Sequence, residues 1–137
     1  MYQKDYILRM IEMLGDFLRA IFGMINKGNY HQATQKLNEV YLNLLRNDAA
    51  FFRKIPATEL TSTLIGEHHY MNEHLEVLAE LFYAEAVLAE ARKSQAESLD
   101  HYRKSLLLFE FIDSAYNTYS FDRQSRMESI RKKIDEF

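Results

Sequence analysis

Three histidines, His68, His69 and His74, lie close together in the sequence beside Glu73 and Glu76. If a helix covers this segment, His69 and Glu73 share one of its faces at i,i+4 spacing, with Glu76 next along. Two imidazoles and a carboxylate are ligands that zinc and iron accept in proteins. The sequence has neither an H-E-x-x-H motif nor the paired E-x-x-H motifs of a di-iron bundle. We therefore predict a solvated polar turn with no metal site and no cofactor, and we keep metal or small-ligand binding here as an alternative.

Carboxylates form a second candidate site, because Glu73, Glu76 and Glu80 lie along one side of a predicted helix. Paired acids act as general acid and base only where a cleft shifts one pKa, and we predict a solvated acidic stripe instead. Nucleophilic catalysis has no support, since the chain has no cysteine and no G-x-S-x-G serine. A glycine-rich phosphate loop is also absent from the sequence. The sequence therefore predicts a protein that is not an enzyme.

The charge balance argues against nucleic acid as a partner. The net charge is −3 and the isoelectric point about 5.9, whereas nucleic-acid-binding domains usually carry a basic excess. Acidic residues follow the basic run 131–133, which is typical of a solvated helix end. Charged residues interrupt every apolar stretch, so we expect neither a membrane span nor a signal peptide. The absence of cysteine fits a reducing compartment, and we expect a cytoplasmic protein.

The elements that must position these residues are helices. Only four glycines and one proline interrupt the chain, which favours helices over a turn-rich β fold. We predict a single all-α domain over residues 1–137. An antiparallel hairpin covers residues 5–46, and a short helical connector covers residues 49–66. A second hairpin covers residues 73–116, and a C-terminal capping helix covers residues 121–136.

The turn of the first hairpin has the spacing G-x-Y-x-x-A, which runs from Gly28 to Ala33. In tetratricopeptide repeats this spacing marks the turn between helices A and B and a small residue of helix B. Leu37 and Val40 continue the pattern with a large and then a small apolar residue. The first hairpin therefore indicates a tetratricopeptide-like unit.

A weaker second copy of the pattern lies in the second hairpin. Lys93 stands in the glycine position, and Ser98, Tyr102 and Ser105 follow as small, large and small residues of helix B. We predict a tetratricopeptide-like right-handed array of antiparallel hairpins. A generic helical bundle is the alternative, because small–large–small spacing occurs wherever helices pack closely.

The opening helix carries a further resemblance. Residues 5–12 read D-Y-I-L-R-M-I-E, which resembles the start of a family of small bacterial helical proteins of unknown function. That family continues with a G-x-Y-x-x-A turn, a proline-containing short helix and a second hairpin. Gly28, Pro56 and residues 75–108 fall in the matching order. The resemblance implies a fold of tetratricopeptide-like hairpins and implies no activity.

The first helix has an excess of apolar residues. They cover well over half of its circumference, whereas a surface helix typically carries a much narrower apolar stripe. We expect this helix to be covered on two sides. Either the short segment with Phe51 and Phe52 folds over it, or a partner does.

These features predict a protein–protein interaction or scaffold module. In a tetratricopeptide-like array, Leu18, Phe22, Tyr83 and Val87 would line the concave face that meets a partner. One alternative is a self-associating structural protein that forms a homodimer through the first helix. The other is a metal- or small-ligand-binding helical protein.

Overall fold

The computed structural model describes residues 2–116 and 119–137. These residues form helices and no strand, which confirms the predicted all-α class. The elements are α1 (Tyr2–Asn26), α2 (Tyr30–Val40), the π-helical turn η1 (Tyr41–Leu45), α3 (Ala49–Arg53), the 3₁₀ turn η2 (Ala57–Glu59), the π-helical turn η3 (Ser62–Glu67), α4 (Asn72–Ala91), α5 (Gln95–Tyr116) and α6 (Phe121–Glu136).

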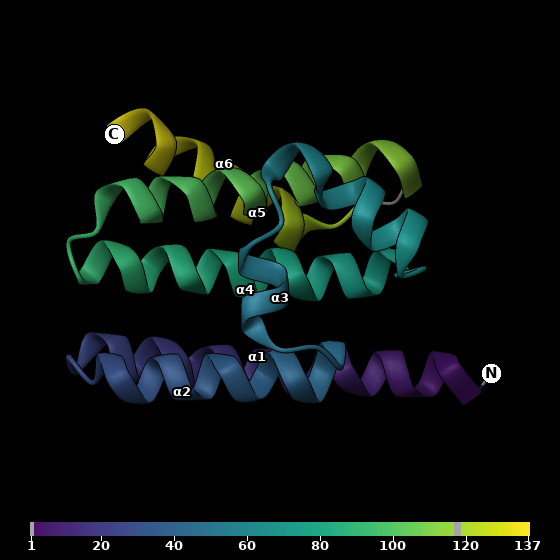
Figure 1. Cartoon of the computed structure of the whole chain (residues 1–137), viewed down its shortest axis with the longest axis horizontal. Helices are drawn as coiled ribbons and strands as arrows, with labels where there is room; N and C mark the ends of the chain where they lie inside the picture. The colour runs from purple at the N-terminus through teal and green to yellow at the C-terminus, as the bar shows by residue number, and fades with distance from the viewer. Residues whose placement is uncertain (1, 117–118) are drawn as a thin grey trace.

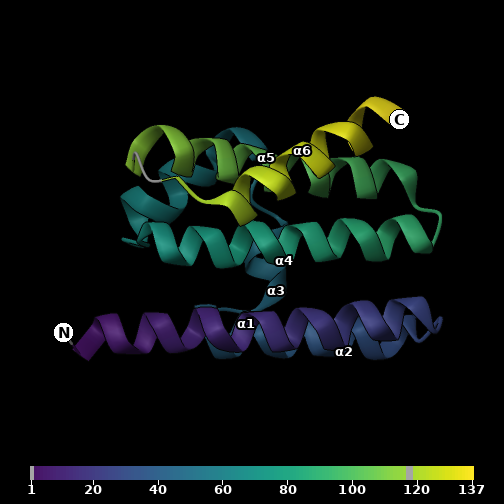
Figure 2. The same cartoon turned by 180° about the vertical axis from the view of Figure 1, so that it is seen from behind.

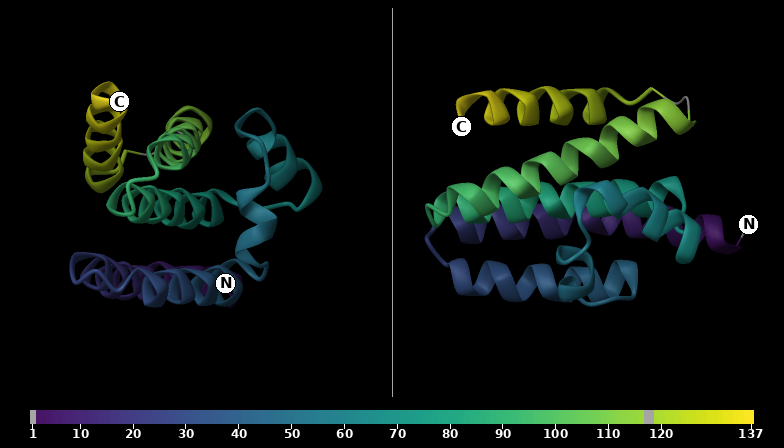
Figure 3. Two further views of the ribbon diagram at one scale, coloured as in Figure 1. Left: turned by 60° about the vertical axis from the view of Figure 1, so that its left-hand side comes forward. Right: turned by 45° about the horizontal axis from the view of Figure 1, so that its top comes forward.

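The helices stack in layers around α4 (Figure 1). α1 and α2 lie side by side and antiparallel on one side of α4, and α5 and α6 lie beyond its opposite side (Figures 1 and 2). Seen end-on, α3 and the short helical turns cross at one flank of α4, while α6 lies at the other flank (Figure 3). α4 is therefore the central helix, and it packs against α1, α2, η1 and α5.

Both hairpins turn through the same backbone geometry. Gly28 has a φ of 78°, and the N–H that follows it donates to the carbonyl of Met24 at 2.8 Å. Lys93 has a φ of 64°, and the next N–H donates to the carbonyl of Ala89 at 2.9 Å. This arrangement is the Schellman motif, which places a left-handed residue, usually glycine, just after a helix. Lys93 therefore takes the place of Gly28, with a backbone penalty of roughly 1 kcal/mol.

The predicted small–large–small residues form the inner faces of the two B helices. All six side chains are buried: Ala33, Leu37 and Val40 on α2, and Ser98, Tyr102 and Ser105 on α5. The hydroxyl of Ser98 donates to the carbonyl of Ala86 at 2.8 Å, and that of Ser105 donates to the carbonyl of Ala79 at 2.7 Å. Small hydroxyl side chains thus bring α5 close to α4 and keep their polar atoms hydrogen-bonded.

α1 is less covered than its apolar excess predicts. One stripe of its side chains is buried in the core, and it consists of Met10, Leu14, Leu18, Ile21 and Ile25. Leu8, Ile11 and Met13 are 52%, 37% and 41% exposed. Within the described residues the chain itself therefore does not cover these side chains on two sides, and cover by a partner stays a prediction.

The segment with Phe51 and Phe52 does not provide that cover. Phe52 stacks on Tyr41 of η1 with ring centroids 5.5 Å apart, and Phe51 meets Phe52 and His68 edge-on. These aromatic rings gather on the flank of α4 that faces α3, because Phe52 also contacts Tyr70 in the loop before α4. They close the core there and leave the first half of α1 open.

The helix ends agree with the predicted spans to within a few residues. α1 begins at Tyr2 rather than at Asp5. α6 begins after Ser120, whose hydroxyl oxygen accepts the N–H of Arg123 at 3.2 Å, as an N-cap does. Residues 117–118, between the predicted second hairpin and the predicted capping helix, lie outside the described residues.

Candidate docking groove

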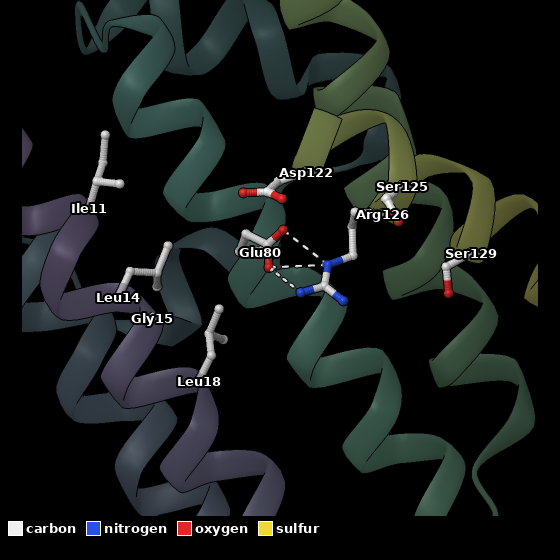
Figure 4. Close-up of a pocket in the computed structure, with 9 residues that line it drawn as sticks. All are labelled: Ile11, Leu14, Gly15, Leu18, Glu80, Asp122, Ser125, Arg126 and Ser129. Atoms are coloured by element: carbon white, nitrogen blue, oxygen red, sulfur yellow. Dashed lines mark hydrogen bonds and ion pairs between the residues drawn. The ribbon is translucent and has the colours of Figure 1, made fainter. Parts of the chain in front are cut away.

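A groove of about 470 Å³ runs between α1 and α6, with α4 as its floor (Figure 4). Its α1 wall is apolar and comes from Ile11, Leu14, Gly15 and Leu18. These positions recur at i, i+3, i+4 and i+7, so one face of α1 presents all four. Leu14 and Leu18 are buried at the base of the wall, whereas Ile11 is exposed at its rim.

The α6 wall is polar and repeats the same spacing. Asp122, Ser125, Arg126 and Ser129 also recur at i, i+3, i+4 and i+7. α1 and α6 run past the groove in the same direction (Figure 2). A smaller adjoining cavity is lined by both Ile11 and Asp122, so the start of α6 lies beside the exposed half of α1.

The charge of Arg126 is neutralised inside the groove. Its guanidinium donates hydrogen bonds of 3.0 to 3.2 Å to both carboxylate oxygens of Glu80, as Figure 4 shows. It also lies over the ring of Tyr83, 4.0 Å from the ring centroid. Burial alone would lower the pKa of Arg126, but the bonds to Glu80 raise it above its ordinary value. Arg126 and Glu80 therefore form a tight pair that fastens α6 to α4.

The other polar side chains of the α6 wall are unpaired. Asp122, Ser125 and Ser129 are exposed, and none has a hydrogen-bond or ion-pair partner within residues 2–116 and 119–137. The groove lining therefore carries one unpaired formal charge in the described part of the chain, the negative charge of Asp122.

The four side chains predicted to face a partner lie along α1 and α4. Leu18 lines the groove. The ring of Phe22 meets that of Tyr83 edge-on with centroids 6.0 Å apart, and Val87 is half-buried one turn further along α4. Phe22 and Tyr83 pack on each other with Arg126 over Tyr83, and neither of the two rings lines the groove.

The acidic stripe on α4 is not simply solvated, which corrects the prediction. Glu76 accepts a hydrogen bond from Arg123 at 2.6 Å, and Glu80 pairs with Arg126. The Glu76 and Glu80 side chains are 31% and 18% exposed. These carboxylates therefore hold α6 in place, and they are not arranged as an acid–base pair.

The basic run near the C-terminus is also used inside the molecule. Arg131 pairs with Glu110 of α5 at 3.0 Å, and Lys133 pairs with Glu90 of α4 at 2.9 Å. The predicted solvated helix end is thus partly ion-paired, and it gives α6 two further attachments to the second hairpin.

The three clustered histidines do not converge. The Nδ1 atom of His74 accepts the N–H of Met71 at 3.1 Å, which is the bond that a capping-box side chain makes at the start of a helix. His74 also stacks on Tyr70 at 5.2 Å, His68 contacts Phe51, and His69 is exposed with a left-handed φ of 57°. In the described ranges, no group of three or more His, Asp or Glu side chains is placed to hold a metal ion.

A buried polar cluster lies on the opposite flank of α4. Glu85 Oε2 accepts hydrogen bonds from the Tyr41 hydroxyl at 3.0 Å and from Arg53 Nε at 2.5 Å. Lys104 Nζ donates to the carbonyl of Arg53 at 3.1 Å. His101 stacks on a neighbouring ring, and its Nδ1 has no hydrogen-bond partner among the described residues. These bonds join α3, η1, α4 and α5, so the cluster fixes the connector to the core.

Sequence patterns single out only part of the groove. Ile11, Leu14 and Leu18 recur at heptad spacing, and that pattern marks the α1 wall. Nothing local in the sequence shows that the Asp122 face of α6 lies opposite, because that depends on how the last helix packs.

Comparison with family models, with curated proteins and with solved structures finds no match to this chain. None of the described helices is long and apolar enough to cross a membrane. The functional argument therefore depends on the geometry of the groove.

Proposed function

We propose that this protein is a non-catalytic protein–protein interaction module and that the groove between α1 and α6 is its docking surface. The observation that carries the proposal is the exposed apolar edge of α1, which consists of Ile11 at the rim of the groove and Leu8 one turn before it, outside the groove lining. Leu8 is 52% exposed and Ile11 37% exposed. Apolar surface beside a concave site typically marks a place where a protein or ligand binds.

We also propose that the hairpins form a right-handed tetratricopeptide-like array. Two features support this. The Gly28 and Lys93 turns share one backbone geometry, and the equivalent small and large residues of α2 and α5 are all buried. The second hairpin also meets the first through its A helix, since α4 contacts both α1 and α2, and α6 packs on α5 as a terminal cap would.

The experiment is affinity capture from the source cells with three baits: the wild-type chain, Ile11→Asp and Leu42→Asp. Leu42 is 52% exposed on η1 and does not line the groove, so it is a matched control for a charge placed on an exposed apolar position. We expect a stoichiometric protein partner that the wild type and Leu42→Asp retain and Ile11→Asp loses. Circular dichroism must show that all three are equally helical. Equal capture by wild type and Ile11→Asp would refute the proposed surface.

Self-association is a second candidate, favoured by the exposure of Met13 on the first helix, 41%. Sedimentation velocity of the wild type and of Met13→Glu measures this. A dimer that Met13→Glu dissociates supports self-association through the first helix, and a wild-type monomer removes it.

A further inference from the structure

We infer that the occupant of this groove is one amphipathic α-helix, with its apolar face on α1 and a lysine or arginine on its polar flank next to Asp122. This inference rests on the proposed function and specifies the partner's chemistry. Its basis is the spacing and the charge of the two walls.

The spacing of the walls favours a helix over an extended peptide. Ile11 and Leu18 are seven residues apart on α1, and Asp122 and Ser129 are seven apart on α6. Seven residues of helix span roughly 10.5 Å. A partner helix repeats its own face over the same distance, so its side chains stay in register with both walls. An extended chain sends alternate side chains to opposite sides at about 3.3 Å per residue and loses that register.

Gly15 makes room for the partner in the middle of the α1 wall. A Cβ built at this position would meet only the Arg19 guanidinium, at 3.7 Å, outside its own helix and chain neighbours. The wall therefore has a notch between its larger apolar residues. Side chains of one helix pack into such gaps on another, as ridges fit into grooves.

The charges of the groove specify the partner's polar flank. Arg126 is already paired with Glu80, whereas Asp122 has no partner among the described residues. Asp122 also lies at the end of the groove beside the exposed Ile11. A basic side chain of the bound helix would pair with this carboxylate, and an acidic one would be repelled. Ser125 and Ser129 offer hydroxyls to neutral polar groups along the rest of the wall.

A second copy of α1 fits the groove poorly. α1 is already packed against α2 and α4, so it would bring its whole hairpin into the space between α1 and α6. A helix without cover on its rear face is the better match, and self-association is therefore an alternative outcome of the test.

The test uses three synthetic peptides and fluorescence anisotropy. The first peptide is an amphipathic helix that carries leucines at positions i, i+3 and i+7 and lysines along one flank. The second has glutamates in place of the lysines, and the third has the first composition in scrambled order. Each is titrated into the wild type, Ile11→Asp, Asp122→Asn, Asp122→Lys and Leu42→Asp, with circular dichroism as the folding control.

We expect the wild type and Leu42→Asp to bind the lysine peptide about tenfold more tightly than the glutamate peptide. Asp122 attracts the lysine of the first peptide and repels the glutamate of the second, and each of these partly exposed charge pairs contributes to the difference in affinity. Asp122→Asn should abolish this preference, Asp122→Lys should reverse it, and Ile11→Asp should weaken both peptides. Equal binding of the scrambled peptide, or a preference unchanged by Asp122→Asn, overturns the inference.

The outcomes separate this inference from the proposed function. If Ile11→Asp loses the cellular partner but no helical peptide binds the wild type, the helical partner is wrong and the docking surface stands. If the wild type is a dimer that Ile11→Asp dissociates and no peptide binds, the occupant is a second copy and the inference is also overturned.

Discussion

Replacement of Glu85 tests whether the buried polar cluster holds the connector to the core. Glu85 is 7% exposed, and its Oε2 atom accepts hydrogen bonds from both Tyr41 and Arg53. Burial, and then the neighbouring Glu85 carboxylate, raise the pKa of Tyr41 well above its ordinary value, so the phenol remains a donor. The perturbations are Glu85→Gln, which keeps an acceptor for Tyr41, and Glu85→Leu, which keeps none.

The magnitude follows from the exposure of the two partners. Removal of one member of a buried ion pair typically costs about 3–5 kcal/mol. The Arg53 side chain is 33% exposed and can be partly hydrated, so we expect about 2–3 kcal/mol for Glu85→Gln. Glu85→Leu also leaves the Tyr41 hydroxyl without a partner at 0% exposure, which adds roughly 1–3 kcal/mol. The total of about 3–6 kcal/mol for Glu85→Leu is a large part of the stability of an ordinary domain.

The assay is urea unfolding followed by circular dichroism, with Glu110→Gln as the matched control. Glu110 also pairs with an arginine, at 3.0 Å, but its side chain is 51% exposed, so its loss should change the free energy of unfolding by less than about 1 kcal/mol. The reasoning is wrong if Glu85→Leu is no less stable than Glu85→Gln, or if Glu85→Gln behaves like the control.

Three further predictions concern single positions. Gly28→Ala should lower the free energy of unfolding by about 1 kcal/mol and Lys93→Gly should raise it by up to about 1 kcal/mol, because both positions have left-handed φ. Urea unfolding measures both changes, and an unchanged stability of Gly28→Ala or a loss of stability in Lys93→Gly would contradict the equivalence of the two turns. Burial lowers the pKa of His101 below its ordinary value of 6.5, so the unfolded chain binds that proton first and stability falls as the pH drops below about 6.5. His101→Phe should flatten this fall between about pH 7 and pH 5, and an unchanged pH profile would exclude His101 as its source. Ser120→Ala removes the N-cap of α6 and should cost about 1 kcal/mol in thermal or urea unfolding, whereas a negligible change would show that the cap bond is not stabilising.

The sequence predicted the local features best. The Gly28 turn depends on residues that are neighbours in the chain, so its chemistry is visible in the sequence. Lys93 shows where prediction from neighbouring residues fails. A lysine does not by itself indicate a left-handed residue, and only its alignment with Gly28 in the repeat pattern points to one.

The groove could not be predicted because it depends on contacts between distant helices. Glu76 and Glu80 lie four residues apart, and so do many other charged pairs in the chain. That they face Arg123 and Arg126 follows from the placement of α6 across α4. The sequence alone therefore predicts a solvated acidic stripe, because only the fold shows which helix covers it.

The exposed apolar residues of α1 support a role in partner binding, which the sequence alone does not show. α4, rather than α1, is the most enclosed helix, and its small alanines let neighbours approach on several sides. The exposed apolar side chains Leu8, Ile11 and Met13 are thus not needed to complete the core of this chain. Burial of the exposed part of Leu8 or Ile11 by a partner would contribute about 1 kcal/mol each.

Leu8→Ala and Ile11→Ala should therefore each weaken partner binding about fivefold. Leu8→Ala should lower the free energy of unfolding by less than about 1 kcal/mol and Ile11→Ala by about 1–2 kcal/mol, since Leu8 is 52% exposed and Ile11 37% exposed. Anisotropy titration with the lysine-flanked peptide and urea unfolding measure the two effects separately. A large loss of stability with unchanged binding would mean that these residues serve the core, and the argument for the groove as a docking surface would then fail.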